Sequence, residues 1–214
     1  MSDLKKISIA NRISKFNRER KWNFFTKQFS FTDQTSILDV GFNNVEYSEI
    51  DNYLEKVYPY PEKITALGIK ESNFFKQRYP QVNAIIYDGD HFPFNGRSFD
   101  IVWSNAVLEH VGERDKQILF LKEIKRVGKA AFITTPNKYF PVEIHTRTIL
   151  LHYLPQRIFY KYLRIIGKKW ATGSYMNLLS KKAIINLLRE AGIDEYKIVA
   201  NKLFLVTLDF VIIF

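Results

Sequence analysis

Residues 85–111 read IIYDGDHFPFNGRSFDIVWSNAVLEHV, and this stretch indicates the class of fold. Two short apolar runs, Ile85–Tyr87 and Phe99–Trp103, are each followed by polar residues, and the Pro and Gly residues between them break regular structure. We interpret the runs as buried strands with a polar loop at each carboxyl end. Ligands of open α/β sheets bind outside the carboxyl ends of parallel strands, so both loops are predicted to face one crevice. The alternative is an ordinary buried strand-loop-strand unit without a ligand.

The same pattern continues on both sides of this stretch. Short apolar runs that predict buried strands alternate with segments that have helical spacing. The strands are predicted at 36–40, 63–69 and 130–135, and the helices at 46–57, 73–79, 113–127 and 181–191. This alternation predicts an α/β fold with a doubly wound, mainly parallel sheet.

Length and composition restrict the possible classes of protein. A chain of 214 residues that is 46% apolar can bury one large core, as a single α/β domain does. The absence of cysteine excludes disulfides, thiolate metal sites and cysteine nucleophiles. The N-terminus has no apolar signal-peptide core, and no apolar run is long enough to span a bilayer. We therefore expect a cytoplasmic protein that is soluble or peripheral at the inner face of the membrane.

The net charge of +10 is concentrated in two segments. Residues 1–28 and residues 138–170 each have a net charge of +6, whereas residues 29–137 have a net charge of −3. A positive field of this kind favours anionic partners, such as phosphorylated or acidic small molecules, anionic lipid surfaces or nucleic acid.

From Asp88 to Val111 the sequence resembles the acidic loop and fourth-strand region of class I S-adenosylmethionine-dependent methyltransferases, of the methyltransferase type 11-like kind. The shared features are an acid, a hydrophobic-Pro-Phe turn, Ser-Phe-Asp, an apolar strand and Leu-Glu-His. The resemblance implies a Rossmann-like, seven-stranded sheet that ends in an antiparallel hairpin, and S-adenosyl-L-methionine as cofactor. It also implies that Asp88 and Gly89 lie next to the adenine and that Asn105 faces the same crevice.

The glycine-rich motif of the family is only partly present. The family has acid-x-Gly-x-Gly-x-Gly after its first strand, and this chain has Asp39 and Gly41 but then Asn43 and Val45. Asn43 can adopt the left-handed conformation that glycine adopts, whereas β-branched Val45 cannot do so cheaply. The acid that holds the ribose at the end of the second strand corresponds here to Gly68. Asp39, Gly41 and Asn43 are the predicted cofactor-binding residues of this turn.

The resemblance covers about residues 36–214 and suggests how the chain is divided. Residues 1–28 are predicted to form a basic, amphipathic helical segment, and residues 29–214 a methyltransferase-like domain with an inserted cap at about 138–179. The sequence TPNKYFPVEIH at the start of this cap resembles methyltransferases of glycan and cell-envelope biosynthesis. His145, which ends it, is the residue that we predict as general base, because an imidazole changes its charge near neutral pH. His152 lies seven residues further on, but two histidines without a carboxylate are a weak metal signal, and we predict no metal site.

Two functions of different classes follow. The first is O-methylation of a small, glycan or lipid-linked acceptor, which we expect to be anionic. Aromatic residues such as Tyr139 and Tyr153 would stack on its sugar faces. Nucleic acid is a poor candidate, because the chain has no cysteine nucleophile and no Asn/Asp-Pro-Pro-aromatic motif after the fourth strand. The second is a catalytically lapsed methyltransferase-like domain that binds a partner or an anionic surface. The incomplete glycine motif and the missing ribose acid favour this second function.

Overall fold

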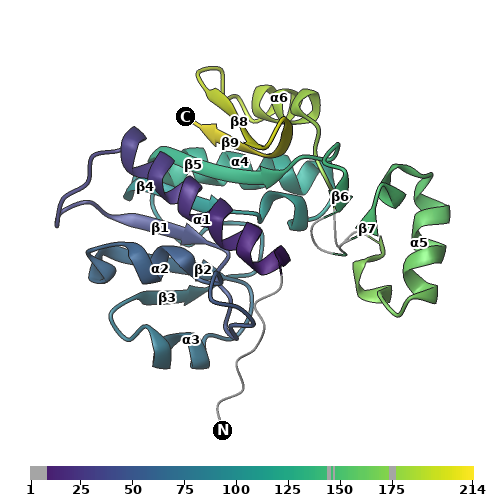
Figure 1. The fold of residues 1–214 in the computed structure, drawn as a ribbon. Coiled ribbons are helices and arrows are strands. Elements are labelled where there is room, and N and C mark those ends of the chain that lie inside the picture. The colour runs from purple at the N-terminus through teal and green to yellow at the C-terminus, as the bar shows by residue number, and fades with distance from the viewer. Residues whose placement is uncertain (1–8, 144–145, 147, 174–176) are drawn as a thin grey trace, which may run out of the picture. The chain divides into compact units, whose positions relative to one another are not determined.

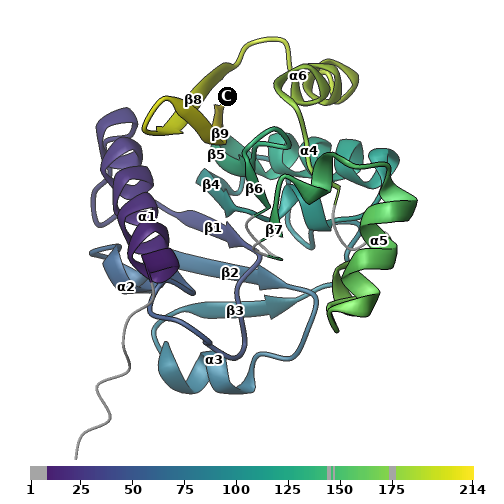
Figure 2. The ribbon, with the colours of Figure 1, turned by 45° about the vertical axis from the view of Figure 1, so that its right-hand side comes forward.

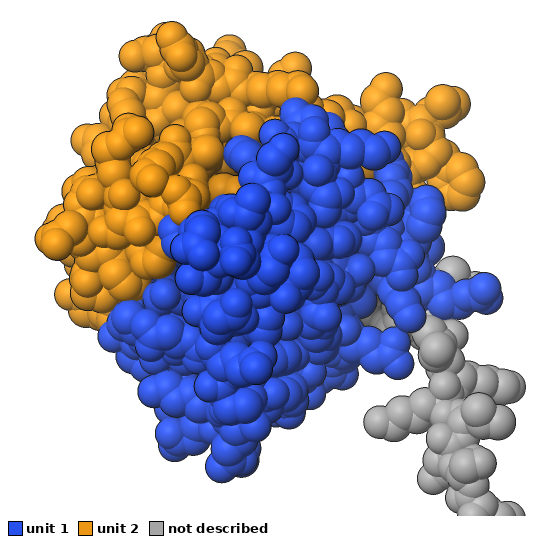
Figure 3. Space-filling model, turned by 90° about the vertical axis from the view of Figure 1, so that its left-hand side faces the viewer, with its two compact units in different colours: residues 1–86 blue, residues 87–214 orange. Residues whose placement is uncertain are grey.

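The computed structural model describes residues 9–143, 146, 148–173 and 177–214. The chain forms two compact units, residues 1–86 and residues 87–214, which are coloured blue and orange in Figure 3. No helix among these described residues is long and apolar enough to cross a membrane.

The first unit contains three parallel strands in the order β3-β2-β1. The four side chains of β1 are all buried, as expected for a strand inside an α/β domain. The elements of this unit are α1 (Ile9–Gln28), β1 (Ile37–Val40), α2 (Tyr53–Val57), η1 (Pro61–Lys63), β2 (Ile64–Gly68), α3 (Asn73–Arg78) and β3 (Asn83–Ile86).

An aromatic cluster packs the end of α1 into this unit. The ring of Phe25 is fully buried and lies within 6.0 Å, centroid to centroid, of the rings of Trp22, Phe29 and Phe31. Burial of large aromatic side chains is a strong stabilising term, so α1 is a packed helix of the first unit.

The helix predicted over residues 46–57 is wrong for most of its length, because only α2 is helical there. Before α2 the carboxylate of Asp51 accepts hydrogen bonds from the backbone N–H groups of Tyr47 (2.8 Å) and Ser48 (3.0 Å). Side chains of this kind compete with helical hydrogen bonds and favour turns. The connection is therefore mainly a turn.

The second unit contains four strands in the order β4-β5-β9-β8. β4 and β5 are parallel, whereas β9 is antiparallel to both β5 and β8, as predicted for the C-terminal hairpin. The rings of Trp103 and Phe132 stack at 4.9 Å between β4 and β5. The helices and strands of this unit outside residues 138–179 are β4 (Phe99–Asn105), η2 (Leu108–His110), α4 (Arg114–Val127), β5 (Gly128–Pro136), α6 (Lys181–Glu190), β8 (Lys197–Leu203) and β9 (Val206–Ile213).

Ser180 caps the N-terminus of α6. The side chain of Ser180 accepts a hydrogen bond from the backbone N–H of Ala183 (3.2 Å), which satisfies one of the donors left free at a helix start. Gly192 follows the helix with a φ of +71°, a conformation that favours glycine.

The predicted cap contains short elements that follow β5 (Figures 1 and 2). They are β6 (Val142–Glu143), β7 (Thr148–Ile149), η3 (Leu151–Tyr153), α5 (Gln156–Ile165) and η4 (Lys169–Ala171). Phe159, Leu163 and Ala171 are buried together and form a small core that joins α5 to η4. The limits of the cap, about 138–179, stay a prediction.

Candidate functional site

The predicted pair Asp39 and Gly41 lies at the carboxyl end of β1, where the turn begins. Asp39 is buried within β1, and Gly41 follows the strand with a φ of +105°. The backbone N–H of Gly41 donates to the carbonyl of Leu67 in β2 (2.8 Å). The turn that follows β1 therefore starts beside the carboxyl end of β2. This is the place and conformation in which a glycine lets the backbone approach a ligand.

The remaining glycine positions of the motif do not need glycine here. Asn43 does not adopt the left-handed conformation that its residue type allows, and Val45 does not either. Instead Asn52 has a φ of +47°, and its side chain accepts from the N–H of Asn43 (2.7 Å) and donates to the carbonyl of Asn43 (2.8 Å) and to Glu46 (3.1 Å). The loss of two glycines therefore introduces no backbone strain at positions 43 and 45.

An aromatic side chain takes the place next to Gly68, where the family has its ribose acid. A Cβ atom on Gly68 would lie 2.7 Å from Cε1 of Phe42. The ring of Phe42 packs on Phe75 at a centroid distance of 4.3 Å, and Phe75 is fully buried. An acid therefore does not fit at position 68 unless this aromatic pair moves.

Asp39 has a buried acidic neighbour, Glu55 of α2. Burial raises the pKa of Asp39 from 3.8 to about 6, while the neighbouring Glu55 and the charge of Arg18 act against this rise. Burial, and then the charge of Asp39, raise the pKa of Glu55 well above its ordinary range. Glu55 therefore keeps its proton to a higher pH than an exposed glutamate does. Glu55 was not predicted from the sequence, because the distance between the two positions gives no sign that they meet.

The predicted adenine loop lies at the start of the second unit. Asp88 is exposed, and its carboxylate accepts a hydrogen bond from the backbone N–H of Asp90 (2.9 Å), which lowers the pKa of Asp88. Gly89 between them has a φ of +95°. The loop thus presents an ionised carboxylate to solvent. A carboxylate in this position can accept a hydrogen bond from an amino group.

Asn105 ends β4 and is tied to the neighbouring strand. Its side-chain oxygen accepts from the hydroxyl of Thr134 in β5 (2.6 Å), and the N–H of Ala106 donates to the carbonyl of Thr134 (2.9 Å). Ala106 has a φ of +60°, so the chain turns sharply at the carboxyl end of β4. Asp88 and Asn105 belong to the second unit and Gly41 to the first, and their convergence in one crevice stays a prediction.

Glu109, within the Leu-Glu-His sequence, joins β5 to the segment at Asn177. Its side chain is fully buried and accepts from the hydroxyl of Thr135 (2.9 Å), while its carbonyl accepts from the N–H of Asn177 (2.8 Å). A buried acid that bridges two segments is a positioning residue. The sequence contains the motif but does not show that Glu109 contacts Thr135 and Asn177.

A cavity of about 650 Å³ lies beside the residues that follow β5. Three tyrosines, a lysine and a histidine are among its lining residues, which include Lys138, Tyr139, His152, Tyr153, Tyr160 and Asn177. The hydroxyl of Tyr153 donates to the carbonyl of Tyr139 (2.7 Å), which fixes one wall. The predicted base His145 lies outside the described residues, whereas His152 lines this cavity.

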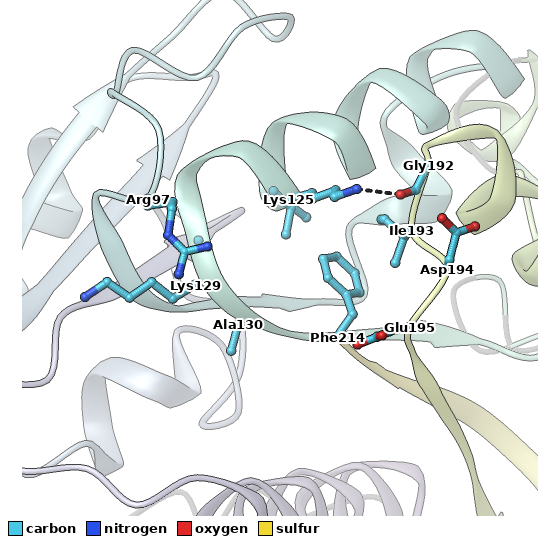
Figure 4. Close-up of a pocket in the computed structure, with 11 residues that line it drawn as sticks. Arg97, Lys125, Lys129, Ala130, Gly192, Ile193, Asp194, Glu195 and Phe214 are labelled. Atoms are coloured by element: carbon cyan, nitrogen blue, oxygen red, sulfur yellow. Dashed lines mark hydrogen bonds between the residues drawn. The ribbon is translucent and has the colours of Figure 1, made fainter.

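A second cavity of about 450 Å³ lies at the other end of the strands of the second unit (Figure 4). It is bordered by Gly128 at the start of β5 and by Phe214 after β9. Arg97 and Lys129 lie on one side of it, and Asp194 and Glu195 on the other. Because ligands of α/β sheets bind at the carboxyl ends of the strands, this cavity is the poorer candidate.

The chain fits the implied cofactor at two of the three places that can be compared. The positive φ of Gly41 suits a turn that approaches a ligand closely. The exposed, ionised carboxylate of Asp88 can accept a hydrogen bond from the amino group of an adenine. The side chain of Phe42 beside Gly68 offers no acceptor for ribose hydroxyls. Among the described residues, no group of three or more His, Asp or Glu could hold a metal ion.

Comparison with protein families gives one match. Residues 38–131 match the family described as a methyltransferase domain. This range includes the turn after β1, the Asp88 loop and the end of β4. No curated protein sequence matches the chain.

Solved structures share the fold at low sequence identity. A SAM-dependent methyltransferase from Methanosarcina mazei is 16% identical with a TM-score of 0.55, and the match covers 86% of this chain and 92% of that one. A methyltransferase from Mesorhizobium loti is 13% identical with a TM-score of 0.59, over 90% of this chain and 96% of that one. Phosphoethanolamine N-methyltransferase 2 of Haemonchus contortus, in complex with phosphomonomethylethanolamine and S-adenosylhomocysteine, is 11% identical with a TM-score of 0.56, over 92% of this chain and 45% of that one.

The predicted α/β class, mainly parallel with an antiparallel C-terminal hairpin, is confirmed by these structures and by the strand pairings. Among these solved structures are an enzyme described as SAM-dependent and one in complex with S-adenosylhomocysteine. Residues 38–131 thus match the methyltransferase-domain family, and the fold is shared with solved structures of SAM-dependent methyltransferases.

Proposed function

We propose that the protein methylates a hydroxyl group of a small, glycan or lipid-linked acceptor that carries negative charge. The observation that supports this most is the cavity beside the residues after β5, where Lys138 stands among Tyr139, Tyr153 and Tyr160. Tyrosine rings pack against sugar faces, and an ammonium group attracts phosphate or carboxylate. The same cavity includes His152, an imidazole that can accept a proton at neutral pH.

The proposed roles divide between binding and proton transfer. Asp39, Gly41, Asn43, Asp88, Gly89 and Asn105 bind the cofactor, which supplies a methyl group on a sulfonium. Most of the rate comes from holding the acceptor oxygen in line with that methyl group. A histidine would accept the proton of the acceptor hydroxyl as the new carbon–oxygen bond forms, while the carbon–sulfur bond of the cofactor breaks and the thioether S-adenosylhomocysteine leaves. His145 is the base predicted from the sequence, and His152 is the second candidate because it lines the cavity.

An acceptor of this class implies a place in the cell. We propose that the protein acts in glycan biosynthesis in the cytoplasm, where nucleotide-linked and lipid-linked sugars present anionic groups. The net charge of +6 in residues 138–170 suits such acceptors, because it raises their local concentration.

The experiment is transfer of a labelled methyl group to a panel of sugars, sugar phosphates and lipid-linked sugars. We expect product with phosphorylated acceptors and little with the neutral sugars. Lys138→Ala should raise the KM for a phosphorylated acceptor about tenfold, the ordinary effect of one charged hydrogen bond, and leave cofactor affinity unchanged. Equal activity on charged and neutral acceptors would contradict the proposed substrate class.

The two histidines are separated by the same assay. His145→Ala and His152→Ala should be compared with wild type across a pH series. Loss of the base lowers kcat about 100-fold or more. It also removes the increase of kcat with pH that the wild type shows as the imidazole loses its proton. We expect this loss in His145→Ala, whereas a loss in His152→Ala alone would assign the base to His152.

The second candidate function is a lapsed methyltransferase domain that binds a partner or an anionic surface. The observation that favours it is Phe42 beside Gly68, since the chain lacks the ribose acid there. Cofactor binding without transfer to any acceptor of the panel would support this function over catalysis.

A further inference from the structure

The second unit contains a long segment without acidic residues. Between Glu143 and Glu190 there is no Asp or Glu, whereas nine Lys and Arg residues occur in the same interval. A folded surface normally mixes both signs of charge, so a one-sided segment of this length produces a strong local positive potential.

α5 has one buried face and one outward face that is both basic and apolar. Phe159 and Leu163 point into the small core of the cap. Arg157, Lys161 and Arg164 are exposed and follow one another at helical spacing, so they lie along one line of the helix. Ile158 and Ile165, seven residues apart, are 54% and 75% exposed and lie on the neighbouring line.

The exposed apolar surface continues around α5. Trp170 in η4 is 52% exposed, and its neighbour Ala171 packs against Phe159 and Leu163, which holds this end of η4 on α5. Ile149 and Leu154, which precede α5 in the chain, are 66% and 41% exposed. In both Figure 1 and Figure 2, α5 lies at the margin of the second unit.

We propose that α5, together with Trp170 of η4, docks on an anionic lipid surface. Electrostatic attraction to acidic small molecules explains the cations but leaves the exposed Ile158, Ile165 and Trp170 without a role. A bilayer interface accommodates both, because anionic head groups attract Lys and Arg while aliphatic and Trp side chains enter the boundary of the acyl region. A nucleic acid would pair with the cations but would gain little from exposed isoleucines. The proposal concerns binding to lipid and does not depend on the acceptor or on catalysis.

The first experiment is vesicle flotation with the full chain. Vesicles of phosphatidylcholine alone are compared with vesicles that also contain phosphatidylglycerol, at low and at physiological ionic strength. We expect binding only to the phosphatidylglycerol vesicles, and weaker binding as the Debye length falls from about 30 Å to about 8 Å. Equal binding to both kinds of vesicle, or none to either, overturns the proposal.

Charge substitutions locate the surface. Lys161→Gln, Arg164→Gln and Lys169→Gln together remove three exposed cations from the α5 region, and Lys181→Gln, Lys182→Gln and Arg189→Gln together remove three from α6. Lys168 is left intact because its ammonium donates to the carbonyl of Thr146. We expect the α5 variant to lose about tenfold to a hundredfold in vesicle partitioning, from the ordinary contribution of each cation near a membrane. The α6 variant controls for net charge, and an equal loss in both variants overturns the assignment to α5.

Apolar substitutions separate lipid from other polyanions. Ile158→Gln with Ile165→Gln should weaken partitioning about tenfold and leave binding to an RNA polyanion unchanged. Phe204→Gln with Leu205→Gln, at residues that are 91% and 93% exposed in the hairpin turn, is the matched control and should behave as wild type. The proposal would be overturned in favour of nucleic acid if RNA bound more tightly than vesicles and if the two isoleucine substitutions changed neither binding. Circular dichroism and the affinity for S-adenosylmethionine confirm that each variant is folded.

Discussion

At position 68 a glycine stands where the family resemblance implies an acid, and the ring of Phe42 lies against it. Because a Cβ at this position would lie 2.7 Å from Cε1 of Phe42, any larger side chain must displace an aromatic ring that packs on Phe75. We expect Gly68→Asp to lower the free energy of unfolding by about 1–3 kcal/mol, the usual effect of overpacking. Urea denaturation followed by circular dichroism measures this change.

A double-mutant cycle tests the cause of that loss. In a Phe42→Ala background the ring is absent, so Gly68→Asp should reduce the stability by much less. If the loss were the same in both backgrounds, the contact with Phe42 would not be the reason for glycine at this position.

The buried acids Asp39 and Glu55 make stability depend on pH. An ordinary aspartate in the unfolded chain releases its proton near pH 4, whereas folded Asp39 retains it to about pH 6. The contribution of this pair to stability is therefore greatest at low pH and is lost as the pH rises through about 6, and Glu55, with its raised pKa, extends the loss to higher pH. Glu55→Gln should increase the free energy of unfolding at pH 8 by about 1 kcal/mol or more, with a smaller gain at pH 4.5.

Urea titrations at these two pH values measure the effect, with Glu62→Gln as the control. Glu62 is exposed in η1 of the same unit, so its substitution should leave the stability unchanged at both pH values. A Glu55→Gln variant that is no more stable than wild type at pH 8 would show that Glu55 is not a buried acid in solution.

Among the elements, the turn between β1 and α2 depends on one side chain. Asn52 adopts a left-handed conformation and makes three hydrogen bonds to Asn43 and Glu46. Asn52→Ala loses both features and should lower the free energy of unfolding by about 2–3 kcal/mol. Asn52→Gly keeps the conformation, so its loss should be about 1 kcal/mol smaller.

Thermal and urea unfolding of the two Asn52 variants give the comparison. Identical losses would show that the left-handed conformation contributes nothing. No loss in either variant would mean that the turn is held by other contacts.

Strands were predicted better than connections, for a physical reason. Runs such as residues 36–40 and 130–135 are buried on both faces, so their composition alone identifies them, and β1 and β5 lie where they were expected. The helix over 46–57 was mostly wrong because Asp51 and Asn52 build a turn through contacts that spacing does not show. Gly128, which follows α4, is required by packing, since a Cβ there would lie 2.6 Å from Cγ2 of Val102.

The site shows the same division. Gly41 and Gly89 were singled out by motif, and both have positive φ. The roles of Phe42, Glu55 and Glu109 could not be predicted, because each depends on a partner that is distant in the sequence. Asn43, whose residue type allows the left-handed conformation, does not adopt it, and Asn52 supplies the left-handed residue of the turn.

Across the whole molecule, charge and cofactor binding are predicted to be separable. Residues 138–170 have a net charge of +6, whereas Asp88 lies in a loop of residues 29–137, which are net acidic. The three substitutions Lys161→Gln, Arg164→Gln and Lys169→Gln should therefore leave the affinity for S-adenosylmethionine unchanged while they reduce binding to anionic vesicles. A loss of cofactor affinity in this variant would show that the two functions share residues.

Calorimetric titration with S-adenosylmethionine and S-adenosylhomocysteine tests the central claim most directly, because it needs no knowledge of the acceptor. We predict saturable binding of one cofactor per chain, and a dissociation constant about tenfold higher in Asp88→Ala, since one hydrogen bond to an ionised carboxylate is lost. Folded protein that binds neither compound, or an Asp88→Ala variant with unchanged affinity, would contradict the account.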